Sequence, residues 1–242
     1  MFLPLVLYVP FFLPAHIQRR GELLFALVNN LALPEVSRVV LLPEQSGISQ
    51  ATLFSHHKLH WAESGAYSRR KFSDVFELIR AANDEHLALI ANADIAFDES
   101  LARAMHVRHF GNAFLALSRW HSKEFMTDAG QLSSKASASH DAWLFNSNTV
   151  RDLIPPSVGR YYFGQPGCDQ RLLYETNRAG LCAVNAAHNI TLAHVHKSAR
   201  RSYIRNKMAP AGGPYGFADP SELSVSANGT LVCTTAYWEM PR

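Results

Sequence analysis

Short apolar runs and amphipathic stretches alternate along the first part of the chain. Leu3 to Val9 is an apolar run of strand length, and Gln18 to Leu31 repeats apolar residues at helical spacing before ending ahead of Pro34. Val39 to Leu42 is a second run of strand length, and Ala51 to Trp61 alternates imperfectly. A strand, a helix and a strand in this order are typical of the start of a parallel sheet.

The same alternation continues through the middle of the chain. Lys71 to Ala82 has apolar residues at i, i+3, i+4 and i+7, which predicts a helix, and residues 86–94 begin with an apolar run typical of a strand buried on both faces. We expect a helix over Glu99 to Met105, capped by Asp98, and a strand over 113–117. These elements predict an α/β fold with a mostly parallel central sheet flanked by helices.

The second half of the chain has longer polar stretches between its elements. Residues 122–139 are small and polar and predict a mobile loop, whereas 139–145 return to strand character. Residues 164–169 form a glycine-rich turn ahead of a predicted helix from Gln170 to Ala179, which Gly180 ends. This order continues the alternation of strands and helices.

The last part of the chain holds one more strand pattern and a less regular tail. The pattern predicts a strand over Leu192 to Ser198 and a last edge strand over residues 231–238. Between them, residues 206–220 predict a flexible loop that is a candidate lid. We therefore expect a catalytic domain over residues 1–205, with residues 206–242 as a flexible loop and C-terminal extension that packs on the same domain.

Charge and cysteine content narrow the class of protein. The formal net charge is +3, and outside Arg19 and Arg20, Arg69 to Lys71 and Lys197 to Arg205 the basic residues are scattered. These clusters indicate local anion sites rather than a nucleic-acid surface. Three cysteines without paired spacing indicate that no disulfide framework forms, so we expect a reducing cytoplasm.

The apolar start of the chain resembles a signal sequence only in hydrophobicity. It lacks a basic segment, it contains three prolines and it is too short to span a bilayer as a helix. Because no other run approaches membrane length, the sequence predicts a soluble or peripheral protein.

Polar residues follow several of the predicted strands. Asn92 and Asp94 come directly after the strand that begins near His86, and ligands of open α/β sheets bind beyond the carboxyl ends of the strands. Asp94 together with His194 and His196, which project to the same side of a strand, would make a mixed oxygen and nitrogen site for Mn²⁺ or Mg²⁺.

Each of these residues also has a purely structural interpretation. Asn92 and Asp94 can form a turn, Asp141 can organise another, and Asp169 lies where a helix N-cap belongs. The two histidines can be satisfied polar residues on a half-exposed strand. The order of the residues along an α/β chain is what favours a functional site.

Four segments resemble the motifs of a known family. They are Asn-Ala-Asp-Ile-Ala-Phe-Asp (92–98), Ser-His-Asp-Ala-Trp-Leu-Phe (139–145), Gly-Gln-Pro-Gly-Cys-Asp-Gln-Arg (164–171) and His-Val-His-Lys-Ser (194–198). In this order they resemble GT-A-fold glycosyltransferases, most closely small bacterial and viral enzymes that build surface glycans. The resemblance runs from about Tyr8 to Tyr203.

The resemblance implies a role for each matching position. Asn92 and Asp94 occupy the first and last positions of the Asp-x-Asp motif, which contact the nucleotide ribose and the metal respectively. Asp169 matches the general base of inverting members, with Cys168 in place of the usual Glu. Asp141 would orient the donor sugar or the acceptor.

Four further residues complete the predicted site. The resemblance implies that His196, with His194 as second choice, ligates the metal. Arg70 flanks the first turn of a helix near the rim of the sheet and can meet a diphosphate, and Lys197 follows the His-x-His pair on the nucleotide-sugar side.

The resemblance implies an enzyme that moves a sugar from a nucleotide-sugar donor, UDP-type by family frequency, to a glycan or lipid-linked glycan hydroxyl in polysaccharide, capsule or lipopolysaccharide synthesis. We expect inversion, a divalent metal, and peripheral membrane association through the acceptor. A retaining transferase, a metal-dependent hydrolase built on the His-x-His pair and aspartates, and a non-catalytic glycan- or nucleotide-binding module are the alternatives. The hydrolase would need three protein ligands around a metal-bound water.

Overall fold

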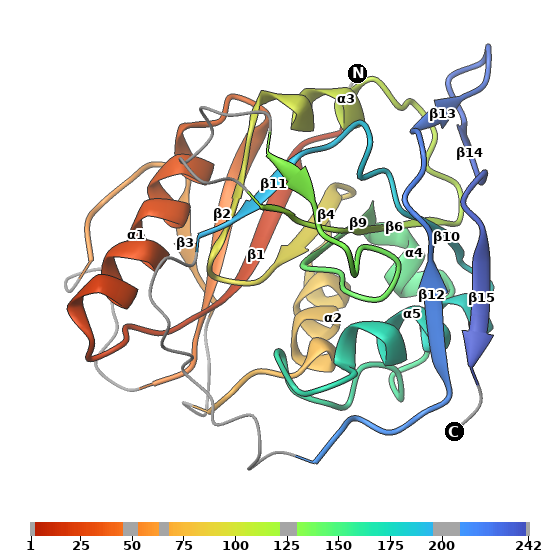
Figure 1. Cartoon of the computed structure of the whole chain (residues 1–242). Helices are drawn as coiled ribbons and strands as arrows, with labels where there is room; N and C mark the ends of the chain where they lie inside the picture. The colour runs from red at the N-terminus through yellow and green to blue at the C-terminus, as the bar shows by residue number, and fades with distance from the viewer. Residues whose placement is uncertain (1–2, 46–52, 63–67, 122–129, 196–208, 241–242) are drawn as a thin grey trace.

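The fold is a mixed α/β domain built around one large sheet. A computed structural model describes residues 3–45, 53–62, 68–121, 130–195 and 209–240. Within them the main sheet has seven strands in the order β10-β6-β9-β4-β1-β2-β3. All pairs in it are parallel except those that β9 makes with β4 and β6. The predicted mostly parallel central sheet is therefore confirmed (Figure 1).

The bounds of the elements are as follows. The main-sheet strands are β1 (Leu5–Phe11), β2 (Val36–Pro43), β3 (Leu59–Trp61), β4 (Leu87–Ala91), β6 (Ala113–Leu117), β9 (Ala142–Asn146) and β10 (Cys182–Val184). The helices are α1 (Ile17–Ala32), α2 (Phe72–Ala81), the 3₁₀ turn η1 (Glu99–Leu101), α3 (Ala102–Met105), α4 (Ser147–Asp152) and α5 (Cys168–Arg178). The remaining strands are β5 (Ile95–Phe97), β7 (Trp120–His121), β8 (Gln131–Leu132), β11 (Leu192–His194), β12 (Tyr215–Ala218), β13 (Ser224–Val225), β14 (Leu231–Val232) and β15 (Tyr237–Met240).

Alternation along the central strands divides the interior into two cores. In β1, Leu5 and Leu7 belong to the core that α1 and α3 cover, whereas Val6 and Tyr8 belong to the core that α2, α4 and α5 cover. Successive side chains of a strand point to opposite faces, so a sheet with helices on both sides needs apolar residues at every position. This is why β1 and β4 are continuous apolar runs.

A second, smaller sheet begins with β5, the strand that follows β4 in the chain. It has the order β5-β11-β7-β8, with β5 antiparallel to β11 and β7 parallel to β11. The amide of Asn30 on α1 holds β5 from the other side, donating to the Ile95 carbonyl at 2.8 Å and accepting from the Phe97 backbone N–H at 3.0 Å. Asn30 thereby makes hydrogen bonds with β5 of the kind that a neighbouring strand would make. These bonds hold the segment that follows Asp94 against α1.

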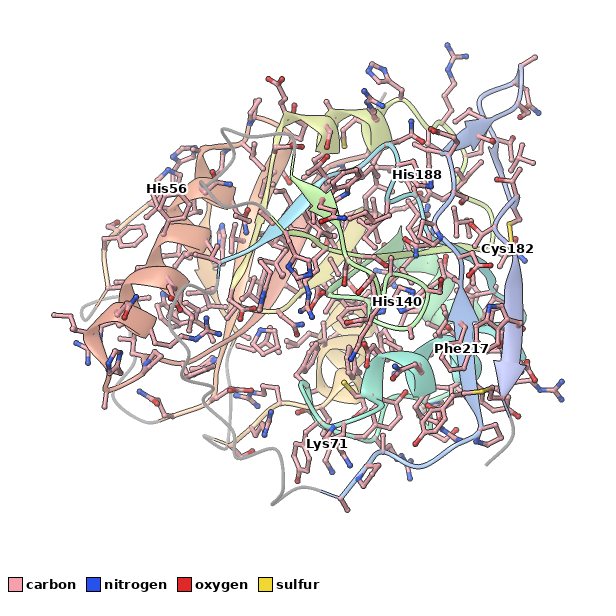
Figure 2. The ribbon with its side chains drawn as sticks, in the orientation of Figure 1. His56, Lys71, His140, Cys182, His188 and Phe217 are labelled. Carbon is pink, nitrogen blue, oxygen red and sulfur yellow. A yellow bond between two sulfur atoms is a disulfide. The ribbon has the colours of Figure 1, made fainter. Side chains whose placement is uncertain are left out.

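The C-terminal strands lie against α5 and the β10 edge of the main sheet (Figure 1). β12 pairs antiparallel with β15, and β13 with β14. Cys182 at the start of β10 forms a disulfide with Cys233, which directly follows β14, across a Cα–Cα distance of 6.2 Å (Figure 2). The prediction that no disulfide forms is therefore wrong. The two residues are 51 positions apart, a separation at which sequence spacing gives no signal.

Several other predictions need correction or refinement. The helix predicted from Gln170 begins at Cys168 with Gly167 as N-cap, so Asp169 lies inside its first turn and is not the cap. Residues 206–220, predicted as one flexible loop, include β12 in their described part. Asp98 is confirmed as a cap, since its carboxylate accepts from the Ser100 backbone N–H. Among the described residues, no helix combines the length and apolar character needed to cross a bilayer.

Candidate functional site

Asn92 and Asp94 lie in the turn that leads from β4 to β5, at the carboxyl edge of the main sheet. The turn is closed by the Ile95 backbone N–H, which donates to the Asn92 carbonyl at 3.1 Å. The Asn92 backbone N–H donates to the Asp141 carbonyl at 3.1 Å, because β9 runs antiparallel to β4 and delivers Asp141 to the same edge. Residues 49 positions apart thus meet where the sequence predicts a ligand site.

Asp94 is at the centre of a buried group of charged side chains. Its Oδ2 is 2.9 Å from the His194 Nε2 and also accepts a hydrogen bond from the Arg19 guanidinium, which reaches it from the first turn of α1. Arg19 donates as well to Glu22 at 2.9 Å and to the Val195 carbonyl at 3.1 Å. The predicted pair Asp94 and His194 is therefore in direct contact.

The surroundings of Asp94 keep it ionised. Burial on its own would raise the pKa of this carboxyl, but His194 and then Arg19, by charge and by hydrogen bonding, hold its pKa well below its usual range. The side chain is 12% exposed. An ionised carboxylate that is nearly buried can bind a cation strongly, since water screens the attraction only weakly.

A second group forms around Asp141, which is 5% exposed. Its Oδ1 accepts from the Asn92 side-chain amide at 3.2 Å and from the Arg119 Nη1 at 3.2 Å. Its Oδ2 is buried and has no hydrogen-bond partner among the described residues. Because a buried carboxylate oxygen without a partner is costly, this atom marks a position where a ligand hydroxyl or a water would be stabilising.

Asp169 joins the group from the first turn of α5. Its Oδ2 accepts from the His140 backbone N–H at 3.2 Å, so it lies beside the residue that precedes Asp141. Burial, and after it the negative charge of Asp141, raises the pKa of Asp169 to about 7; the backbone N–H groups of Asp169 and His140 and the Arg119 guanidinium oppose the rise. Asp169 is nevertheless partly exposed, so a ligand can reach it.

The two groups lie near each other. Arg119, His194 and Asp141 all act electrostatically on His121, whose pKa is lowered first by desolvation and then by Arg119 and His194, while Asp141 opposes the fall. β7, which carries His121, is hydrogen-bonded to β11, which carries His194. The carboxyl edge of the sheet therefore gathers the Asp94 group, the Asp141 group and Asp169 in one region.

Of the remaining predicted residues, the structure describes Arg70 alone. His196 and Lys197 lie outside the described residues. Arg70 is at the end of β2, where its Nε and Nη2 both donate to the Pro43 carbonyl, at 3.2 and 2.8 Å. Its backbone N–H donates to Glu44. Arg70 thus organises the rim of the sheet, and no described contact joins it to the aspartates.

Two residues of the site were not assigned to it from sequence. Arg19 was grouped from sequence only with Arg20, as a local anion site, although its spacing with Glu22 and Asn30 places all three on one buried helical face. Arg119 was not singled out, although it is the second residue after the end of β6. A polar residue just past the carboxyl end of any central strand is the signal that would have found Arg119.

Two protein donors fit a divalent cation. Asp94 Oδ2 and His194 Nε2 form a mixed oxygen and nitrogen pair of the type that Mn²⁺ accepts. Among the described residues no group of three His, Cys, Asp or Glu side chains could hold a metal ion. A cation held here would therefore complete its coordination with the oxygens of water molecules or of a bound ligand.

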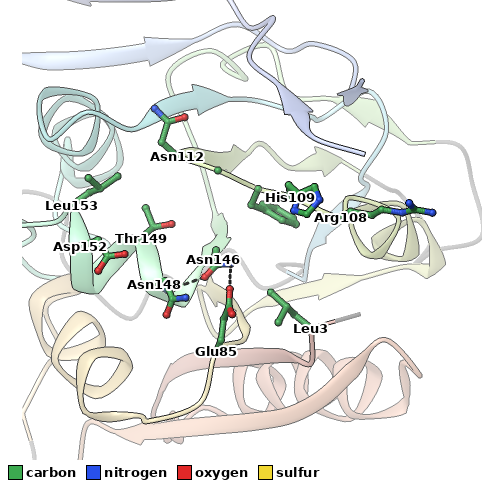
Figure 3. Close-up of a pocket in the computed structure, with 12 residues that line it drawn as sticks. Leu3, Glu85, Arg108, His109, Asn112, Asn146, Asn148, Thr149, Asp152 and Leu153 are labelled. Carbon is green, nitrogen blue, oxygen red and sulfur yellow. Dashed lines mark hydrogen bonds between the residues drawn. The ribbon is translucent and has the colours of Figure 1, made fainter. Parts of the chain in front are cut away.

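A pocket of about 500 Å³ lies at the opposite edge of the sheet (Figure 3). Its lining includes Leu3, Glu85, Asn112 and Asn146, which lie next to the amino ends of β1, β4 and β6 and the carboxyl end of the reversed strand β9. Asn146 donates to Glu85 at 2.7 Å across it. The pocket contains none of the predicted site residues.

A mostly parallel sheet with polar residues gathered at its carboxyl edge is the architecture that open α/β proteins use to bind nucleotides and related ligands. No protein-family model matches the sequence, and no curated protein matches it. Solved structures do match the fold. One is described as mannosyltransferase PcManGT from Pyrobaculum calidifontis, in complex with GDP-Man and Mn²⁺.

This similarity has a TM-score of 0.51 at 14% sequence identity and covers 82% of the present chain. The chain spans 59% of the length of that mannosyltransferase chain. At this identity the similarity is one of fold, and it shows that the present chain shares its α/β fold with that chain.

Proposed function

We propose that this protein is a nucleotide-sugar-dependent glycosyltransferase of GT-A type. The observation that carries the proposal is the convergence of Asn92, Asp94, Asp141 and Asp169 at the carboxyl edge of the sheet, where hydrogen bonds join Asn92 to Asp141 and Asp169 to the adjacent His140. The mannosyltransferase with a similar fold binds a GDP-sugar and Mn²⁺, which supports the same kinds of ligand here.

The donor would bind with its diphosphate near Asp94 and its sugar near Asp141. Asp94 and His194 would hold a divalent cation, which when bound neutralises charge that develops on the leaving nucleoside diphosphate. The partnerless Oδ2 of Asp141 would accept a hydroxyl of the donor sugar or the acceptor, and Asn92, tied to Asp141, would face the ribose. His196, Lys197 and Arg70 stay predictions as ligand or diphosphate contacts.

Asp169 would act as the general base. It would take the proton from the acceptor hydroxyl, whose oxygen then bonds to the anomeric carbon as the bond to the nucleoside diphosphate breaks, with inversion. A base is most effective when its pKa lies near the working pH, and the pKa of Asp169 is about 7. Burial and, after it, the negative charge of Asp141 make Asp169 a stronger base than an isolated aspartate.

The finer parts of the proposal rest on the sequence. We propose a glycan or glycolipid hydroxyl as acceptor and peripheral membrane association through it. The expected cytoplasmic location was inferred from the absence of disulfides, and the bond between Cys182 and Cys233 removes that basis. A UDP-type donor was expected from family frequency, whereas the mannosyltransferase of similar fold binds GDP-Man, so both nucleotides belong in the first screen.

The decisive experiment separates binding from transfer. Asp169→Asn should keep donor binding, measured by calorimetry, and lower the transfer rate at least about 100-fold, the usual contribution of a general base. Asp152→Asn changes an exposed aspartate at the opposite edge and should leave both unchanged. If Asp169→Asn transferred sugar at the wild-type rate, the assignment of the base would be overturned. If the wild type bound the donor but transferred no sugar, the protein would be a binding module.

A further inference from the structure

Arg19 is buried in a way that its place on a surface helix does not explain. It is the third residue of α1, yet only 7% of it is exposed, whereas its neighbour Arg20 is exposed. A buried guanidinium is stable only when it is paired and hydrogen-bonded. The contacts of Arg19 therefore indicate its role.

Those contacts join three segments that are far apart in the sequence. Arg19 reaches Glu22 on its own helix, the Asp94 carboxylate 75 positions later, and the Val195 carbonyl 176 positions later. The Val195 backbone N–H in turn donates to the Asp94 carbonyl at 2.7 Å. The guanidinium thus fixes both the side chain of Asp94 and the chain immediately after His194.

Arg19 also donates a hydrogen bond to the carboxylate oxygen of Asp94 that would ligate a metal. The Arg19 guanidinium and the His194 Nε2 both contact the same oxygen, Asp94 Oδ2. A divalent cation that approaches the Asp94 and His194 pair must meet a positive charge within a few ångströms in a poorly hydrated place, where repulsion is screened little. Glu22 Oε2, 2.9 Å from the Arg19 Nη1, offers the guanidinium a second carboxylate.

We propose that Arg19 is a positioning residue that holds Asp94 ready and competes with a divalent cation for this carboxylate. When a cation binds, Arg19 gives up Asp94 and keeps Glu22. The proposal deepens the proposed function, because it names the residue that sets how strongly the transferase binds its metal. It nevertheless concerns metal affinity alone and can be tested without any sugar donor.

The test is a calorimetric titration of Mn²⁺ into the full chain and its variants, without nucleotide. Arg19→Gln removes the competing charge and should tighten Mn²⁺ binding by about fivefold or more. Arg19→Lys keeps the charge and should stay near the wild-type affinity, and Arg20→Gln, which changes the exposed neighbour, should have no effect. Melting temperatures measured alongside show which variants are folded.

Glu22→Gln is the second variant and predicts the opposite sign. Without its alternative carboxylate the guanidinium should hold Asp94 more strongly, so Mn²⁺ binding should weaken. This result decides the matter if Arg19→Gln does not fold. Unchanged or weaker binding in folded Arg19→Gln, unchanged or tighter binding in Glu22→Gln, or no Mn²⁺ binding by any of these proteins would overturn the proposal. The predicted shifts without any sugar transfer would leave it standing and remove the proposed function.

Discussion

At the scale of single residues, Asp169 is held in a state that costs the folded protein stability. Burial and the nearby Asp141 charge raise its pKa to about 7, whereas an aspartate in the unfolded chain titrates near 4. The folded state therefore binds more protons than the unfolded state between these values, and the contribution of Asp169 to stability falls as pH rises through this window.

This predicts that removing the charge stabilises the protein. Asp169→Asn keeps an acceptor for the His140 backbone N–H and should raise the free energy of unfolding at pH 8 by about 1–3 kcal/mol, while having little effect at pH 4. Denaturant unfolding at both pH values measures it. A variant that is equally destabilised at both would show that the carboxylate serves the structure rather than the chemistry.

The pH dependence of transfer should report the same carboxyl. We expect kcat/KM to rise with pH and level off above about 7, as Asp169 loses its proton. Asp141→Asn removes the charge that helps to raise this pKa, so the rise should move to lower pH even if the maximal rate falls. If the pH profiles of kcat/KM had the same midpoint in the wild type and in Asp141→Asn, the group that titrates would not be Asp169.

Asp94 behaves in the opposite way. Although burial alone would raise its pKa, His194 and Arg19 hold it below its usual range, so its contribution to stability is present at neutral pH and is lost as pH falls below about 4. Asp94→Asn should destabilise the protein at pH 7 by about 3 kcal/mol, because it removes one partner of a buried ion pair. Thermal unfolding at pH 7 measures this, and a loss below about 0.5 kcal/mol would contradict the pairing.

At the scale of elements, apolar runs predicted where strands lie but not how they run. Residues 113–117 are a strand with the predicted bounds, and α1 and α2 begin and end within a residue of prediction. The reversal of β9 was not predicted, because an apolar run has no direction and only its partners β4 and β6 define one. That reversal matters for function, since it brings Asp141 to the carboxyl edge beside Asn92.

The C-terminal strands depend on a pairing that spacing could not reveal. The disulfide between Cys182 and Cys233 joins the β10 edge of the main sheet to the end of β14. Replacing both cysteines by serine should lower the free energy of unfolding by about 2–4 kcal/mol, since a cross-link of this kind restricts the unfolded chain. Wild-type unfolding with and without reductant is the matching control, and equal stability in all samples would show that the bond is absent in solution.

At the scale of the whole molecule, the site is assembled by the sheet rather than by any one motif. The sequence placed Asn92, Asp94, Asp141 and Asp169 at element ends, from which an α/β fold predicts a common edge. The hydrogen-bond partners of these residues could not be predicted from the sequence, because Arg19 is 75 positions from Asp94 and Arg119 is 22 positions from Asp141. Local patterns can show that a side chain is polar and well placed, but only packing shows which charge neutralises it.

The central claim is that this edge binds a nucleotide sugar. The most direct measurement is a calorimetric titration of GDP and UDP, with and without Mn²⁺, into the wild type and Asp94→Asn. One of the two nucleotides should bind the wild type in a Mn²⁺-dependent manner and raise its melting temperature, because a ligand of the folded state stabilises it by mass action. In Asp94→Asn the Mn²⁺ dependence should disappear. Failure of both nucleotides to bind the wild type with Mn²⁺, or undiminished Mn²⁺-dependent binding by the variant, would contradict the account.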